Sequence, residues 1–135
     1  MSLGLQPLPR CTPEEARMLS PLQLAYVGDS VQALWVRTRL VKQNLPVHAM
    51  HTAATQAVNA VAQSRALTAL LPRLTEEELL IVKRGRNAHA RHNAPKSATV
   101  GEYASATGLE ALLGYLYLTG AEQRLTEIFH WMTEE

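Results

Sequence analysis

Two isolated carboxylates are the residues of this 135-residue chain that could most readily do chemistry. Asp29, the only aspartate, is the only charged residue in 18–36, and Glu110 is the only charged residue in 103–121. Both stretches predict apolar helices, where an unpaired carboxylate is costly unless it has a cation, hydrogen bonds or a proton. Small residues flank both positions, so two such helices could pack closely and bring the carboxylates together on a hydrated Mg²⁺, which prefers oxygen ligands.

Each carboxylate also has a purely structural interpretation. Asp29 could cap a helix or accept a buried hydrogen bond, and Glu110 could sit at a helix edge in water. The pair together favours metal-assisted hydrolysis of a phosphodiester. In that chemistry a metal lowers the pKa of a bound water and offsets charge in the transition state.

Positive charge gathers in the middle of the chain, although the formal net charge is only +1. No acidic residue occurs in 30–75 or in 79–101. The densest basic group follows in 83–96, and we expect it to bind phosphates. The alternative is a solvated helix end whose arginines interact favourably with the helix dipole.

Capping boxes at Thr12, Ser20 and Thr75 predict where three helices begin. We expect helices at about 21–42, 47–71 (bent or split around 59–64), 76–87, 102–119 and 121–132, with 88–100 as a loop. The first of these is apolar nearly all round, which is typical of a central, buried helix. No alternating run, repeat or linker occurs. The prediction is an all-α fold forming one compact domain over 1–135, with its core at about 20–133 and a flexible 1–12.

Composition excludes several classes of protein. A single cysteine excludes a disulfide within the chain and a thiolate metal cage. Neither a basic leader followed by an apolar run nor a continuous membrane-spanning apolar stretch occurs. We therefore expect a cytoplasmic protein with no membrane partner.

Three motifs resemble those of one known family. The sequence LAYVGDSV at 24–31 resembles the signature helix of the ribonuclease III nuclease domain. EALLGYL at 110–116 resembles the second acidic helix of that domain. KRGRNA at 83–88, with Pro95 and Lys96 after it, resembles the small Mini-ribonuclease III subfamily. The similarity covers about 22–119, and three motifs in the same order make it specific.

The resemblance implies a homodimeric, all-α endonuclease that cuts double-stranded RNA with Mg²⁺, for which Mn²⁺ can substitute. The Mini subfamily is associated with maturation of the 23S ribosomal RNA precursor in bacteria, and a ribosomal protein would be a further partner. By the same resemblance Asp29 and Glu110 are the catalytic metal ligands. The implied RNA-binding residues, which would contact phosphates and sugar hydroxyls, are Lys83, Arg84, Arg86, Asn87 and Lys96.

Two positions depart from the larger family. It carries a glutamate four residues before the signature aspartate and an aspartate three residues before the second glutamate, where this chain has Ala25 and Thr107. This thinner site leaves the number of metals and the directness of ligation open. It also motivates the alternative of a non-catalytic RNA-binding module of the same fold. A weaker alternative is a helical protein-interaction module with an incidental charge pattern.

Overall fold

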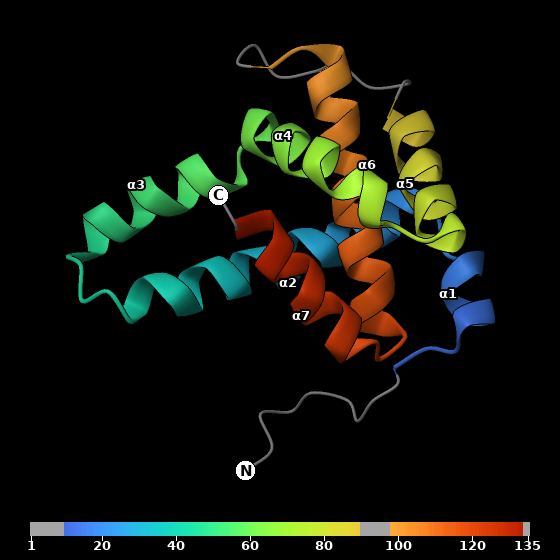
Figure 1. Ribbon diagram of the computed structural model, residues 1–135, viewed down its shortest axis with the longest axis horizontal. Coiled ribbons are helices and arrows are strands. Elements are labelled where there is room, and N and C mark those ends of the chain that lie inside the picture. The colour runs from blue at the N-terminus through green and yellow to red at the C-terminus, as the bar shows by residue number, and fades with distance from the viewer. Residues whose placement is uncertain (1–9, 90–97, 134–135) are drawn as a thin grey trace.

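The computed structural model describes residues 10–89 and 98–133, and these ranges are helical with no strand (Figure 1). The all-α prediction is therefore confirmed for the described part of the chain. In chain order the elements are α1 (Pro13–Met18), α2 (Pro21–Val41), α3 (Val47–Val58), α4 (Ala60–Leu70), a 3-10 turn (Leu71–Arg73), α5 (Glu76–His89), α6 (Val100–Leu118) and α7 (Glu122–Thr133).

Reciprocal hydrogen bonds form all three predicted capping boxes. At Ser20, the hydroxyl accepts from the Gln23 backbone N–H, and the Gln23 side chain accepts from the Ser20 N–H. The same exchange occurs at Thr12 and at Thr75. A fourth box at Thr99 begins α6. Side chains thus satisfy backbone donors that helix starts leave unpaired.

The predicted split in the alanine-rich segment occurs at Asn59. Its backbone is extended, with φ −72° and ψ 162°, so the helix cannot continue through it. The Asn59 side chain donates to the carbonyls of Thr55 and Gln56 and accepts from the Ala62 N–H. One residue therefore caps the end of α3 and the start of α4.

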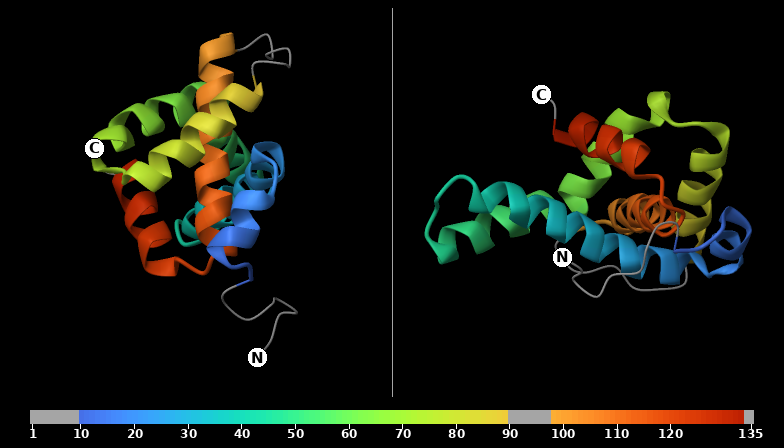
Figure 2. Two further views of the ribbon diagram at one scale, coloured as in Figure 1. Left: turned by 90° about the vertical axis from the view of Figure 1, so that its right-hand side faces the viewer. Right: turned by 90° about the horizontal axis from the view of Figure 1, so that it is seen from below.

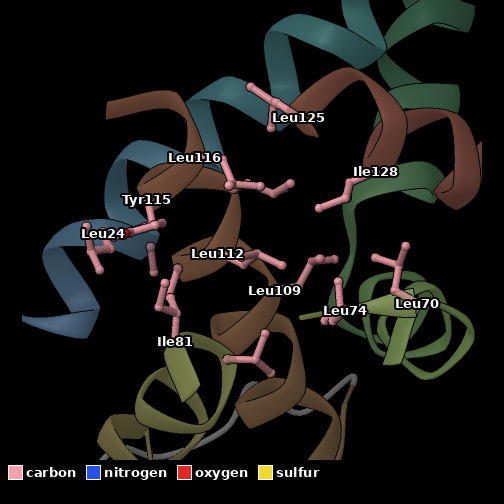
Figure 3. Close-up of a cluster of buried hydrophobic side chains, with 14 of the residues drawn as sticks. Leu24, Leu70, Leu74, Ile81, Leu109, Leu112, Tyr115, Leu116, Leu125 and Ile128 are labelled. Atoms are coloured by element: carbon pink, nitrogen blue, oxygen red, sulfur yellow. The ribbon is translucent and has the colours of Figure 1, made fainter. Parts of the chain in front are cut away.

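Helix α6 is the centre of the fold. Figure 2 (right) views it almost end-on, with α2, α4, α5 and α7 around it. Its leucines Leu109, Leu112 and Leu113 are completely buried. Figure 3 shows Leu109 and Leu112 among side chains that include Leu70 of α4, Ile128 of α7 and Leu74, which follows the 3-10 turn.

The prediction that the helix beginning at Pro21 is the central, buried one is wrong. Helix α2 buries only Leu24, Ala25, Gly28 and Gln32, all in its first two thirds. Trp35 still packs on Phe129 of α7, and beyond it α2 runs beside α3, forming an arm that projects from the molecule (Figures 1 and 2). Helix α3 has no buried residue at all. Toward its C-terminal end α2 leaves Leu34 (67%) and Val41 (65%) exposed.

The expected loop at 88–100 is shorter than predicted at both ends. Helix α5 continues through His89, and α6 already begins at Val100. Within that segment, 90–97 lies outside the described residues, as do 1–9 and 134–135. The backbone N–H groups of Arg10 and Cys11 both donate to the Leu118 carbonyl, which ties the chain to α6 from residue 10 onward. Within the described ranges, no helix is both long and apolar enough to cross a membrane.

Candidate active site

Helices α2 and α6 cross with their backbones in contact, and two glycines make this possible. A Cβ added to Gly28 would lie 1.7 Å from the Glu110 carbonyl oxygen. A Cβ added to Gly114 would lie 1.9 Å from the Leu24 carbonyl oxygen. No side chain fits in either space, so glycine is required at both positions. Because Asp29 follows Gly28 directly, this crossing brings its carboxylate to Glu110.

The two carboxylates lie together at the rim of the crossing. Glu110 is half-buried, and Asp29 is exposed. Burial, together with a hydrogen bond and charge repulsion from Asp29, raises the pKa of Glu110 from 4.5 to about 8. A hydrogen bond from Gln63, 3.3 Å from Nε2 to Oε2, acts in the opposite direction. Without a cation, repulsion therefore favours keeping a proton on this pair.

The exposure of Asp29 corrects the expectation that it stands in a central, buried helix, whereas Glu110 does stand in the most buried one, α6. Asp29 stands in the middle of α2, so it does not cap that helix. The outward position follows from the surface location of α2 described above. An exposed carboxylate can reach solvent and a substrate, which a buried hydrogen-bond acceptor could not.

The donor chemistry of the pair fits a small, hard cation. Two adjacent carboxylates that repel each other gain from a divalent ion, and Mg²⁺ takes oxygen ligands while retaining several waters. In 10–89 and 98–133, no cluster of three or more histidines, cysteines or acids could hold a metal. A metal here would therefore have Asp29 and Glu110 as its carboxylate ligands, with water completing the shell.

The two positions where the larger family has acids are buried in this chain. Ala25 is 7% exposed and belongs to the core. Thr107 is 5% exposed, and its hydroxyl donates to the Tyr103 carbonyl one turn earlier. Ala25 therefore packs in the core at α2, and Thr107 makes a local hydrogen bond within α6.

Three of the predicted RNA-binding residues stand exposed on α5. Lys83, Arg86 and Asn87 border a hollow between α5, the 3-10 turn and the first half of α6. A second pair of glycines lets α5 and α6 approach closely there, since a Cβ on Gly85 would lie 2.8 Å from the Gly108 Cα. Because these three side chains are exposed, they can contact a polyanion.

Arg84 is engaged differently from its neighbours. Its guanidinium donates to the carbonyls of Arg17 and Leu19, at 3.4 and 3.3 Å, and so ties α5 to the last turn of α1 and to the connection that follows it. The structure thus gives Arg84 a structural contact that its sequence context did not indicate. Lys96, the last predicted RNA contact, lies outside the described residues.

Sequence reasoning missed two glutamines beside the acids. Gln32 and Gln63 are each 3% exposed, and Gln63 Nε2 lies 2.7 Å from Gln32 Oε1. Gln32 follows Asp29 by three residues, so their shared helix face was a usable signal. Gln63 offered no such signal, because only the packing of α4 on α6 brings it to Glu110.

The sequence is similar to known proteins over most of its length. A family model described as the ribonuclease III domain matches residues 22–121. A Mini-ribonuclease 3 from Symbiobacterium thermophilum is 50% identical over 111 residues, which cover 82% of this chain and 85% of the relative. Another from Thermoanaerobacter sp. is 46% identical over 118 residues, covering 87% of this chain and 82% of the relative.

A solved structure has the same fold. The crystal structure of a protein from Fusobacterium nucleatum superposes with a TM-score of 0.82 at 31% sequence identity. The match covers 88% of this chain and 97% of that one.

Proposed function

The chain belongs to the ribonuclease III family of endoribonucleases, among its Mini-ribonuclease 3 members, and from that premise we propose that it cleaves double-stranded RNA with Mg²⁺ held by Asp29 and Glu110. The observation that carries the proposal is the meeting of these two carboxylates at the glycine crossing of α2 and α6. Mn²⁺, which takes the same oxygen ligands, can substitute.

The bound ion would supply a water of lowered pKa and would offset the charge that develops on the phosphate. Asp29 faces solvent, so its carboxylate would accept a hydrogen bond from that water and orient it toward phosphorus. Glu110 is held from the other side by the Gln63 amide. The two acids thereby have separate tasks, one directed to the reacting water and one to anchoring the site.

Substrate binding falls to the exposed side chains of α5. Lys83 and Arg86 bring positive charge, and the Asn87 amide can donate or accept at a sugar hydroxyl. An A-form duplex displays phosphates and 2′-hydroxyls across a shallow minor groove, and proteins recognise it mainly through these groups. Arg84 and Lys96 complete the proposed RNA-binding set.

A homodimer would provide one site for each strand of the duplex. Support comes from the exposed apolar residues along the arm and its base, where Tyr26 is 81%, Leu34 67% and Val47 65% exposed. Such a patch marks an interaction surface.

We expect Leu34→Lys to convert a dimer to a monomer in multi-angle light scattering. Leu80→Lys is the matched control, since Leu80 is 61% exposed on α5, away from the arm. A wild-type monomer at micromolar concentration would contradict the dimer.

We propose the precursor of 23S ribosomal RNA as the natural substrate, with a ribosomal protein bound to that RNA as a further partner, in the cytoplasm. The membership of the chain among the Mini-ribonuclease 3 proteins supports this. Mapping the ends produced from precursor RNA, naked and with its ribosomal proteins bound, tests it. Cleavage of generic duplexes but never of this precursor would contradict the assignment.

The first experiment compares wild type and Asp29→Asn on a defined RNA duplex with Mg²⁺. We expect cleavage by wild type and a loss of about 1000-fold or more in the variant, because several kcal/mol of transition-state stabilisation disappear. Circular dichroism and RNA binding in EDTA should be unchanged, since Asp29 is exposed and lies outside α5. Full activity in the variant would overturn the assignment of the site.

A further inference from the structure

A buried amide joins the three helices that surround the acidic pair. Gln63 on α4 donates from Nε2 to Gln32 Oε1 on α2, at 2.7 Å, and to Glu110 Oε2 on α6, at 3.3 Å. Both glutamines are 3% exposed. A buried amide of this kind is retained only where its hydrogen bonds are made.

The two bonds fix which way the amide points. A primary amide has two N–H donors on its nitrogen, and here both partners are oxygen acceptors. Gln32 takes one N–H, so the other is aimed at Glu110. A reversed amide would set carbonyl oxygen against carboxylate oxygen, which is repulsive.

This arrangement places a neutral donor where Glu110 needs one. The Asp29 carboxylate pushes Glu110 away electrostatically, whereas the Gln63 N–H attracts its Oε2. A hydrogen bond on one oxygen fixes the orientation of the carboxylate and leaves its second oxygen to bind a metal. Partners behind a metal ligand act in this way, and their loss typically reduces metal affinity or activity about 10- to 100-fold.

We propose that Gln63 is a positioning residue that orients the Glu110 carboxylate for divalent-metal binding, and that Gln32 locks the Gln63 amide in the orientation this requires. The inference rests on the proposed metal-dependent function. It assigns to α4, which contributes no acid to the site, the task of holding one of the two ligands.

A purely structural role is the competing explanation, because a buried hydrogen bond between α2 and α4 also stabilises the fold. The two roles separate when both glutamines are changed together. Removing one partner leaves the other unsatisfied and destabilises the protein, whereas replacing both by apolar side chains of similar shape is close to neutral. Methionine matches glutamine in length and is unbranched, which makes it the appropriate substitute.

The experiment measures Mn²⁺ affinity by electron paramagnetic resonance, and thermal unfolding without metal, in four proteins. These are wild type, Gln63→Met, Gln32→Met and the double variant with both substitutions. For Gln63→Met we expect a lower melting temperature and Mn²⁺ affinity about 10- to 100-fold weaker. The double variant should regain most of the melting temperature but none of the metal affinity. Gln32→Met keeps the donor to Glu110, so its loss of affinity should be smaller.

Recovery of Mn²⁺ affinity together with stability in the double variant would overturn the proposal, as would wild-type affinity in a folded Gln63→Met. If Gln63→Met fails to fold, the double variant alone decides between the two roles. Failure of the proposed function has a different signature, since wild type itself would then bind no Mn²⁺ and cleave no duplex RNA.

Discussion

Glu78 and Glu110 are both carboxylates on helices that pack into the core, and their surroundings are opposite. Glu78, 6% exposed, receives two hydrogen bonds from the Arg124 guanidinium, at 2.7 and 2.8 Å. Burial alone would raise its pKa, but the bonds from Arg124 and from the Thr75 backbone outweigh burial, so the pKa is lowered. Among the described residues Glu110 has no such cation, and burial together with the neighbouring Asp29 raises its pKa to about 8.

The difference separates a carboxylate that completes the fold from one that is left for a ligand. Arg124 matches the charge of Glu78, whereas no cationic side chain in 10–89 or 98–133 matches the charge of Glu110, which a bound metal ion would. Strongly raised carboxylate pKa values of this kind gather at functional sites. The comparison therefore identifies the acidic pair on physical grounds that are independent of family membership.

The largest effect should come from closing the space that lets the acidic pair form. Gly28→Ala would place a methyl group inside the Glu110 backbone, so we expect α2 and α6 to separate and the protein to lose its cooperative thermal transition. Gly101→Ala is the control, because the nearest neighbour of a Cβ there is 3.9 Å away and the residue lies in α6. That variant should be neutral or stabilised by about 0.5–1 kcal/mol. Equal behaviour of the two variants would contradict the close crossing.

Neutralising each carboxylate should have opposite consequences. Glu78→Gln removes the charge that the half-buried Arg124 guanidinium matches, so Arg124 loses this ionic partner. We expect a loss of roughly 2–3 kcal/mol of unfolding free energy. Glu110→Gln removes a repelled charge, so the metal-free protein should become more stable at pH 8 while losing Mg²⁺-dependent cleavage. Urea unfolding in EDTA, paired with a cleavage assay, measures both. A destabilised Glu110→Gln would show that the repulsion is relieved within the chain.

The pH dependence of stability should likewise run in two directions. The pKa of Glu110 is raised in the folded state, so its contribution is present at acidic pH and is lost as pH rises from about 4.5 through 8. The pKa of Glu78 is lowered, so its contribution is present above about 4.5 and is lost as pH falls below that value. In the absence of metal, the unfolding free energy of wild type should therefore fall relative to that of Glu110→Gln as the pH rises from about 4.5 to about 8. Saturating Mg²⁺ should reduce this difference, because a ligand that binds the native state stabilises it. The same dependence of unfolding free energy on pH in both proteins above about pH 4.5 would contradict this.

Substitutions of the basic residues on α5 should have the smallest effects, mainly on RNA affinity and its dependence on salt. Lys83→Ala and Arg86→Ala should each weaken duplex RNA binding and reduce the slope of log affinity against log salt by about 1, with stability unchanged. Arg84→Ala should weaken RNA binding and, unlike the other two, also lower the unfolding free energy by roughly 1–2 kcal/mol, since two backbone carbonyls lose their donor. Salt titrations in EDTA test the first two variants, and chemical unfolding tests the third. A salt slope unaffected by Lys83→Ala or Arg86→Ala would remove α5 from the RNA contact.

Local signals made much of the fold predictable. The capping boxes at Ser20 and Thr75 mark helix starts because the bonds they form span only three residues. Asn59 ends one helix and begins another through its own backbone and side chain. Thr99 and Glu102 have the same sequence pattern, so the start of α6 was equally predictable from the sequence. The extent of the domain at the two chain ends stays a prediction.

Other features depended on which helices became neighbours. The apolar pattern of α2 is compatible with a central helix or with an exposed arm, and periodicity alone does not distinguish them. The engagement of Arg84 by the carbonyls of Arg17 and Leu19 crosses more than sixty residues of sequence. No pattern within a single helix contains that information.

By itself, the sequence determined that two apolar helices each carry one carboxylate with glycine nearby, and that cationic residues concentrate between them. Burying a charge is costly, so such an exception in composition is informative before any fold is known. Only the tertiary structure decided that the two carboxylates meet, that Gln63 reaches Glu110, and that α6 rather than α2 is the centre. Those outcomes depend on the packing of distant helices, where the absence of a single Cβ sets which backbones can touch.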